Sequence, residues 1–220
     1  MELILSVISI SIVCDGTSDL CIQDLVQLVI DESFPDQAFR ISAAREVIPA
    51  HGTLEVRLKK AFTAYEPHII VCHRDAEGFS LEARTAEISE AHTQANLPIS
   101  VVPAVPVRMI ESWLLTDANA IRCAADNRNG TVDLNLPRHR NIEQLTNPKE
   151  VLFLALKTAS NLPPQRLKNF SEYRARSRIA GFIENFESLK LLPSFHQFER
   201  RLIEAVTLQQ EQQRGIGVAN

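Results

Sequence analysis

LILSVISISIVCDGTSD, at residues 3–19, is the most informative stretch of this 220-residue chain. Residues 3–13 are rich in leucine and β-branched side chains and lead into the Asp15-Gly16 turn, after which apolar residues recur at helical spacing as far as Val29. This order predicts a buried strand, a tight turn and a helix. The apolar run is short and has no basic segment before it, so we expect neither a signal peptide nor a membrane span.

Strand and helix patterns alternate along the first half of the chain. The expected strands are residues 3–13, 39–48, 68–72 and 99–102. The helices expected between them begin near Leu20, after the capping residue Thr53, and at Ser80. Such alternation predicts an α/β fold with a mainly parallel, Rossmann-like sheet and helices on both faces. Functional sites of these sheets lie beyond the carboxyl ends of the strands.

A polar loop is expected to divide the chain. DNRNGTVDLNLPRHR, residues 126–140, is rich in residues that favour turns, and it follows a helix expected over residues 108–125. We therefore predict an α/β domain over 1–125, a connecting loop over 126–148, a basic helical extension over 149–210 and a flexible tail over 211–220. Helices within the extension are expected at 149–159, 173–186 and 194–208.

The net charge of −4 conceals two regions of opposite sign. Residues 1–135 carry 10 basic and 19 acidic side chains, whereas residues 136–220 carry 13 and 8. An acidic part is therefore joined to a basic part. The four cysteines show no C-x-x-C pair and no zinc-like spacing, which favours a structural role as free thiols in a reducing compartment, the cytoplasm.

Two acidic clusters follow predicted strands. Asp15 and Asp19 come after the first strand, and Asp75 and Glu77 come after the third. Carboxylate oxygens are the ligands that Mg²⁺ and Mn²⁺ prefer, so one divalent-metal site is expected where these strands end. The alternative is ordinary turn chemistry, because Asp and Gly both favour turns. Asp19 lies four residues beyond Asp15, inside the expected helix, and ranks last among these ligands.

Longer motifs add a resemblance to a family. CDGTSD and VCHRDAEG resemble the two acidic motifs of the TOPRIM domain of topoisomerases, primases and OLD-type nucleases. Asp15 stands where that family usually has Glu, and Asp75-Ala76-Glu77 stands where it has Asp-x-Asp. Both changes keep the charge and alter the reach of the side chain.

Further stretches resemble one TOPRIM-like family of bacterial proteins, related to the TOPRIM domains of OLD-type nucleases and often encoded beside ATPases in defence loci. The resemblance covers roughly residues 10–200 and is carried by HRDAEG, VPVRMIESWLL, AIRCAADNRNG, LPRHRNIEQLTNPKEVL, LPPQRLKNF and IENFESLKLLPSFHQFE. It implies a TOPRIM-like domain, and it implies that Glu111 is a further metal ligand or general base and Arg108 a phosphate contact. The alternative is a capping acid and a surface arginine.

His73 and a basic segment complete the set of candidate residues. His73 is expected to orient a water, to stabilise a leaving oxygen or simply to bond a carboxylate. The segment PQRLKNFSEYRARSR, residues 164–178, interleaves cations with Phe170 and Tyr173. Such a pattern is typical of nucleic-acid binding, or of a solvated helix face. The expected phosphate contacts are Arg74, Arg108, Arg166, Lys168, Arg174, Arg176 and Arg178.

Together these features predict a Mg²⁺- or Mn²⁺-dependent nuclease that cleaves DNA or RNA. The family resemblance implies an effector of antiviral defence that works with an ATPase partner, and an oligomer is compatible with the sequence. The alternative is a catalytically inactive TOPRIM-like module that binds or regulates an ATPase. The chain has no G-x-x-x-x-G-K-[ST] or G-x-G-x-x-G stretch, so it is not expected to hydrolyse ATP by itself.

Overall fold

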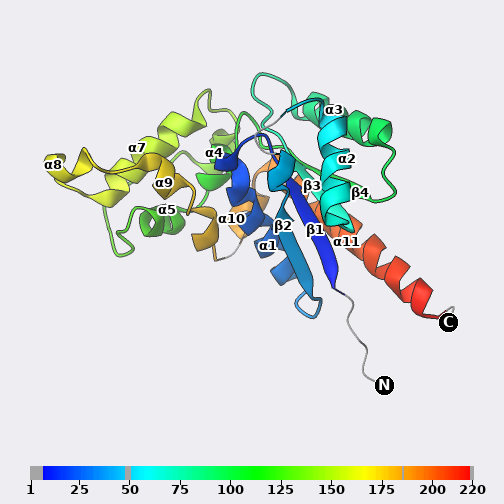
Figure 1. The fold of residues 1–220 in the computed structure, drawn as a ribbon. Helices are drawn as coiled ribbons and strands as arrows, with labels where there is room; N and C mark the ends of the chain where they lie inside the picture. The colour runs from blue at the N-terminus through cyan, green and yellow to red at the C-terminus, as the bar shows by residue number, and fades with distance from the viewer. Residues whose placement is uncertain (1–6, 48–50, 185, 219–220) are drawn as a thin grey trace. The chain divides into compact units, whose positions relative to one another are not determined.

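The structure is a computed structural model that describes residues 7–47, 51–184 and 186–218 (Figure 1). Its internal contacts divide the chain into two compact units. The first unit combines residues 1–74, 82–104 and 197–220, and the second combines residues 75–81 and 105–196. The expected boundary near residue 125 lies within the second of these units.

The first unit contains a four-stranded sheet in which every neighbouring pair of strands is parallel. The strands are β1 (Ile8–Val13), β2 (Phe39–Ala43), β3 (Ile69–His73) and β4 (Ser100–Ala104), in the order β2-β1-β3-β4. All six residues of β1 and all five of β3 are buried. Burial on both faces is typical of central parallel strands, and it confirms the predicted α/β class.

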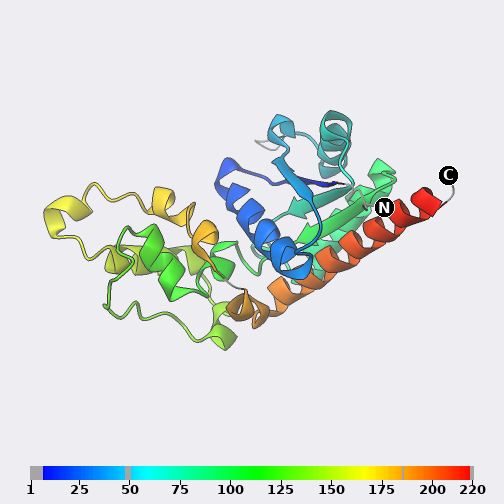
Figure 2. The same ribbon diagram turned by 90° about the horizontal axis from the view of Figure 1, so that it is seen from below.

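Helices cover the two faces of this sheet (Figure 2). The helices α2 (Leu54–Tyr65) and α3 (Leu81–Ala95) lie on one face, and α1 (Ile22–Ser33) lies on the other with α11 (Pro193–Val218). Two short 3₁₀ helices, η1 (Thr17–Cys21) and η2 (Arg45–Val47), follow β1 and β2. Thr53 caps α2 as predicted, since its hydroxyl accepts a hydrogen bond from the Val56 amide at 3.4 Å.

The second unit is built from helices, most of which are short. They are α4 (Glu111–Leu114), α5 (Ala118–Ala124), α6 (His139–Ile142), α7 (Pro148–Ser160), α8 (Pro164–Leu167), α9 (Glu172–Arg176), η3 (Ala180–Phe182) and α10 (Glu187–Lys190). Trp113 is fully buried, contacts Phe195 edge to face at 5.1 Å, and donates its indole N–H to Ser194 Oγ at 2.8 Å. The core of this unit is therefore aromatic and includes a satisfied polar contact.

Three helix predictions needed correction. The helix expected over 108–125 is divided into α4 and α5, because the Asp117 carboxylate accepts hydrogen bonds from the amides of Asn119 and Ala120 and starts a new helix. The helix expected over 173–186 ends at Arg176. The tail expected to be flexible from residue 211 continues α11 to Val218, because Gln, Glu and Arg are good helix formers.

Some predictions fall partly on residues outside the described ranges, namely residues 3–6 of the first strand, Ile48 of the second, residue 185 of the helix expected over 173–186, and residues 219–220 of the expected tail. Across the parts of the chain that are described, no helix has both the length and the apolar character needed to cross a membrane.

Candidate functional site

Asp15 lies just beyond β1, and two arginines bind its carboxylate. Arg57 Nη1 lies 2.6 Å from Oδ1, and Arg74 Nε lies 3.0 Å from Oδ2. Arg57 is a residue of α2 and is itself buried, where it also donates to the carbonyl oxygens of Cys14 and Val47. Both oxygens of the best candidate metal ligand thus accept hydrogen bonds from guanidinium groups.

The network continues away from Asp15 through a second carboxylate. Arg74 Nη1 is paired with Glu87 Oε1, and Arg84 Nη1 lies 2.5 Å from the other oxygen of Glu87. Three arginines and two acids therefore alternate at this edge of the first unit. We call these five residues the arginine network: Asp15, Arg57, Arg74, Arg84 and Glu87.

This setting determines the charge state of the neighbouring groups. Burial raises the pKa of the Asp15 carboxyl, but the hydrogen bond from Arg57 and the charges of Arg74 and Arg57 outweigh it and hold that pKa below its ordinary value of 3.8. Burial raises the pKa of the Cys14 and Cys72 thiols to about 12. Asp15 is thus ionised at neutral pH, whereas both thiols remain protonated and unreactive.

His73 has a structural contact in the sheet. It is the last residue of β3, its ring is buried, and Nδ1 lies 3.0 Å from the carbonyl oxygen of Ala104 in β4. One of the expected roles of His73 was a hydrogen bond to a carboxylate. The contact seen here is of the same kind, but its partner is a backbone carbonyl.

Asp75 and Glu77 belong to the second unit, where they meet the segment before α4. Asp75 Oδ1 accepts a hydrogen bond from the Ile110 amide at 2.9 Å. The Glu77 amide donates to the Arg108 carbonyl at 2.7 Å, and Arg108 Nη1 donates back to the Glu77 carbonyl at 3.1 Å. Glu77 and Arg108 both have positive φ angles, of 52° and 64°. These hydrogen bonds therefore connect two motifs of the sequence, HRDAEG and VPVRMIESWLL.

Glu111 and Arg176 form a buried ion pair. Arg176 Nε lies 2.9 Å from Glu111 Oε1, and the two side chains are only 6% and 4% exposed. Arg176 is one of the expected phosphate contacts, and its guanidinium lies inside the second unit, where it is bonded to Glu111. Arg178 is also occupied, since Nη2 bonds the Ala124 carbonyl oxygen and lies 2.9 Å from Asp126 Oδ1.

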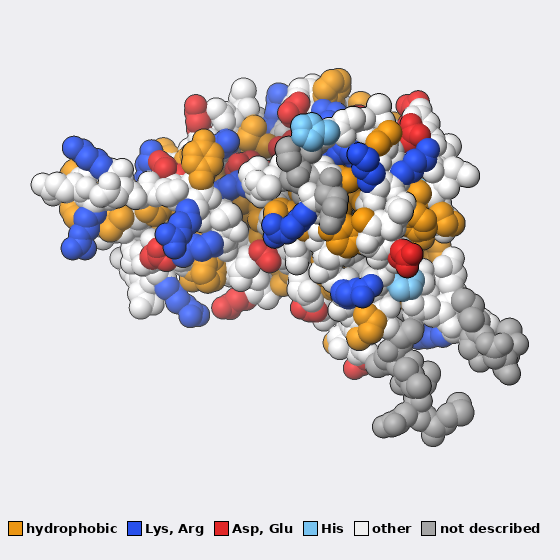
Figure 3. Space-filling model, in the orientation of Figure 1, with side chains coloured by type: hydrophobic (Ala, Val, Ile, Leu, Met, Phe, Trp, Pro, Cys, Tyr) orange, Lys and Arg blue, Asp and Glu red, His pale blue; other side chains and the backbone are white. Residues whose placement is uncertain are grey.

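The remaining cations of the basic segment are exposed. Arg166, Lys168 and Arg174 all lie at the surface of the second unit, on and after α8 and on α9. Figure 3 shows Lys and Arg side chains around the α8 end of this unit. Tyr173 is 63% exposed, and Lys149 Nζ lies 5.1 Å from the centre of its ring. An aromatic ring among cations is a surface suited to single-stranded nucleic acid.

The acids predicted to bind a metal ion have other partners in the structure. Asp19 lies in η1, where its carboxylate accepts from the Ser18 hydroxyl at 3.0 Å. Among the residues that the structure describes, no group of three or more His, Cys, Asp or Glu side chains is arranged to hold a metal ion. With Asp15 bound by two arginines and Glu111 paired with Arg176, the described arrangement does not form a ready Mg²⁺ or Mn²⁺ site.

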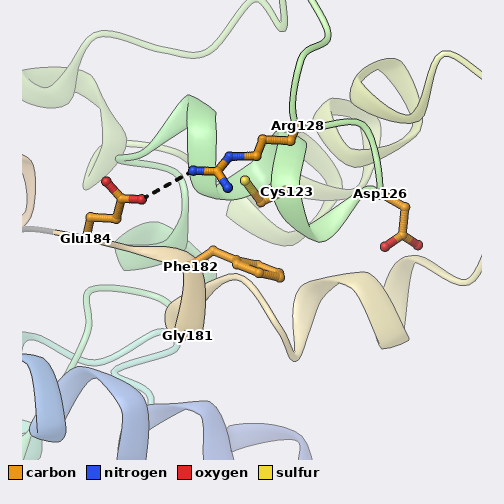
Figure 4. A pocket seen from close by; sticks show the side chains of 6 residues that line it. All are labelled: Cys123, Asp126, Arg128, Gly181, Phe182 and Glu184. Carbon is orange, nitrogen blue, oxygen red and sulfur yellow. Dashed lines mark ion pairs between the residues drawn. The ribbon is translucent and has the colours of Figure 1, made fainter.

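A pocket of about 410 Å³ in the second unit was not predicted (Figure 4). It lies between α5 and η3 and is lined by Cys123, Asp126, Arg128, Gly181, Phe182 and Glu184. Its residues come from two stretches about 55 positions apart, which the spacing of motifs cannot connect. The polar run ADNRNG after α5 combines Asp and Arg with turn residues, and it is a signal in the sequence for one of these stretches.

Comparisons with known proteins gave no relative: no family model matched the chain, and no curated protein or solved structure was found to be similar to it.

Proposed function

We propose that this chain is a cytoplasmic Mg²⁺- or Mn²⁺-dependent nuclease that hydrolyses phosphodiester bonds of DNA or RNA. The observation that carries the proposal is the pairing of two strands. β1 and β3 are parallel neighbours in the sheet, with Val13 opposite Cys72. Asp15 follows β1 by two residues and Asp75 follows β3 by two, so each acid comes directly after one of two adjacent strand ends.

The surface of the second unit supports an anionic polymer as substrate. Arg166, Lys168 and Arg174 are exposed on and near α8 and α9, and exposed cations neutralise phosphates. The resemblance to the TOPRIM-like family favours the same substrate. It also underlies the proposed role as an effector of antiviral defence with an ATPase partner.

A second candidate function is favoured by the geometry of Asp15. Each oxygen of the Asp15 carboxylate accepts a hydrogen bond from one arginine, which leaves fewer of its lone pairs open to a metal ion. A TOPRIM-like module that has lost catalysis and binds an ATPase would keep such an arrangement as a structural ion pair.

A cleavage assay with matched variants tests the leading proposal. Labelled single- and double-stranded DNA and RNA would be incubated with the wild type, Asp75→Asn and Glu77→Gln, in Mg²⁺, in Mn²⁺ and in EDTA. We expect cleavage only with metal, and a loss of about 100-fold or more in both variants, because charge stabilisation at the phosphate carries such chemistry. Glu150→Gln, an exposed acid on α7 in the same unit, serves as the control and should cleave like the wild type.

The outcomes separate the two candidates. Equal cleavage by Asp75→Asn and the wild type would point to a contaminating nuclease and refute the proposal. Binding of Mn²⁺, measured by electron paramagnetic resonance, gives a readout that does not depend on turnover. A chain that neither cleaves any of the four substrates nor binds Mn²⁺ more tightly than Asp75→Asn would be the inactive module.

A further inference from the structure

The pocket between α5 and η3 is built by local contacts of the second unit. α5 packs against η3, and α5 is followed by Asp126, whose φ of 59° turns the chain away from the helix. Arg178 Nη2 binds both the Ala124 carbonyl and Asp126 Oδ1, the latter at 2.9 Å. The Asp126 carboxylate is thereby held at one end of the pocket.

The side chains around the pocket differ in chemistry from one side to another. In the view of Figure 4, Glu184 and Asp126 stand at opposite ends, the Phe182 ring lies on one side, and Arg128 lies with Cys123 on the other. Phe182 is 40% exposed although it is an aromatic residue. The space of about 410 Å³ thus has an aromatic wall, a guanidinium wall and a carboxylate at each end.

Arg128 and Glu184 form a loose pair that a ligand can open. Arg128 Nη2 lies 3.8 Å from Glu184 Oε1, and both side chains are largely exposed. Exposed ion pairs of this kind contribute little stability, so separating them costs little. The guanidinium is then able to cover a flat group bound against Phe182, or to meet a phosphate attached to it.

We propose that this pocket binds an amino-substituted nucleobase, namely adenine, cytosine or guanine. The base stacks on the Phe182 ring, as unstacked bases do on aromatic side chains. Its exocyclic amine donates a hydrogen bond to the carboxylate of Asp126, which Arg178 holds in place. Arg128 packs over the opposite face of the base. The same chemistry is offered by a free nucleotide and by an unpaired base of a single strand.

The binding does not depend on the proposed nuclease activity, because all six lining residues are distinct from the candidate metal ligands. The chain also carries a reporter for the pocket. Cys123 lines it and is partly exposed, whereas Cys14, Cys21 and Cys72 are buried. With their pKa raised to about 12, Cys14 and Cys72 react slowly with alkylating reagents at neutral pH. An occupied pocket should therefore shield the most reactive thiol of the chain.

The test is protection of Cys123 from iodoacetamide in EDTA, followed by mass spectrometry of the Cys123 peptide. The probes are adenosine monophosphate, the 5′-monophosphate of unsubstituted purine riboside, ribose 5-phosphate, tryptophan and a short oligo(dA). We expect adenosine monophosphate to protect at about 0.1–1 mM, as suits one stacked and hydrogen-bonded base, and the amine-free nucleotide, which differs from it only in the amine, to require about tenfold more. Phe182→Leu should lose about tenfold in protection by the nucleotide. Leu191→Ala, which changes an exposed apolar residue outside the pocket, should not.

Each outcome of the protection assay either supports or refutes base recognition by the pocket. Stronger protection by oligo(dA) than by the mononucleotide identifies the base of a strand as the ligand, and the reverse identifies a free nucleotide. Protection by ribose 5-phosphate or tryptophan equal to that by the nucleotide would refute base recognition. So would protection that is unchanged in Phe182→Leu, or none by any nucleotide at about 10 mM, a concentration well above the expected dissociation constant. Loss of cleavage in the nuclease assay has no bearing on these measurements.

Discussion

The buried pair of Glu111 and Arg176 gives the sharpest prediction about stability. The change is Arg176→Met, which removes the guanidinium and keeps most of the volume of the side chain. In the wild type, Arg176 Nε lies 2.9 Å from Glu111 Oε1, and neither side chain is more than 6% exposed. The variant leaves the Glu111 carboxylate buried without this cation.

The magnitude follows from burial and distance. Two unit charges at 2.9 Å attract by about 6 kcal/mol at an effective dielectric constant of about 20. Removal of both groups from water offsets most of that attraction, so the intact pair contributes little net stability. Removal of one partner is different, because the cost of burying the other charge is no longer offset. We expect Arg176→Met to lower the free energy of unfolding by about 3–5 kcal/mol.

A double-mutant cycle separates this cost from lost packing. Glu111→Leu combined with Arg176→Met leaves no buried charge at the pair, and we expect it to recover most of the loss. Urea unfolding can be followed by fluorescence of Trp113, the single tryptophan of the chain, which is buried in the same unit. A loss of this size moves the midpoint by about 1–3 M urea. Arg174→Met, on the exposed side of the same short helix, is the control and should change stability by less than about 0.5 kcal/mol.

Two results would contradict the reasoning. The first is a loss below about 1 kcal/mol for Arg176→Met, which would mean that water reaches the carboxylate. The second is a double variant as unstable as the single one, which would assign the loss to packing. Glu111→Gln with native stability and abolished Mn²⁺ binding would instead establish the metal-ligand role that the family resemblance implies.

Three further predictions concern separate contacts. Thr53→Ala removes the capping oxygen of α2 and should lower stability by about 1 kcal/mol in urea unfolding, whereas Thr53→Ser should not. Ser194→Ala removes the acceptor of the Trp113 indole and should cost about 1–3 kcal/mol with a shift in tryptophan emission; an unchanged spectrum would contradict the contact. The folded-state pKa of Asp15 lies below its ordinary 3.8, so its stabilising contribution is present above pH 4 and is lost as the pH falls through the folded-state value. Asp15→Asn should therefore flatten the dependence of the urea midpoint on pH below about 4, and parallel curves would count against the pairing.

Local patterns of the sequence predicted the sheet well. The third strand was expected over residues 68–72 and is observed at Ile69–His73, because a short apolar run between polar turns has few other folded solutions. The first strand reads ISISIV, an alternation that would suit a sheet with one solvated face. Ser9 and Ser11 are nevertheless buried, and Ser9 Oγ lies 2.7 Å from His68 Nδ1. The two buried serines therefore differ: Ser9 has this partner, whereas Ser11 Oγ makes no hydrogen bond with any residue that the structure describes.

The partners of the candidate acids could not be predicted from spacing. Arg57 is 42 residues from Asp15, and Arg176 is 65 residues from Glu111. Such pairs depend on how helices pack against the rest of the fold. The strand period of 2 residues and the helix period of 3.6 residues predict single elements and not their packing. The sequence therefore offers only the helix of Glu111 and the family resemblance as guides to its role, and neither indicates its buried cation, Arg176.

The arginine network did leave a signal in the sequence, on two helices. In α2, Arg57 shares the apolar stripe with Leu58 and Ala61, and in α3, Arg84 shares it with Ile88. A cation at a core position requires an anion to pair with it, so this pattern would have directed attention to a search for acidic partners of Arg57 and Arg84.

The same network alters what the charge of the chain implies. Residues 1–135 are acidic as a whole, which suggested a surface that attracts metal ions and repels phosphate. The five side chains of the arginine network nevertheless comprise three guanidinium groups and two carboxylates, and both carboxylates are paired. Their combined charge is positive, and the excess lies next to the acid proposed as a ligand. The net field at this strand end is therefore opposite in sign to the charge of residues 1–135, so a regional charge count cannot predict the field at a single strand end.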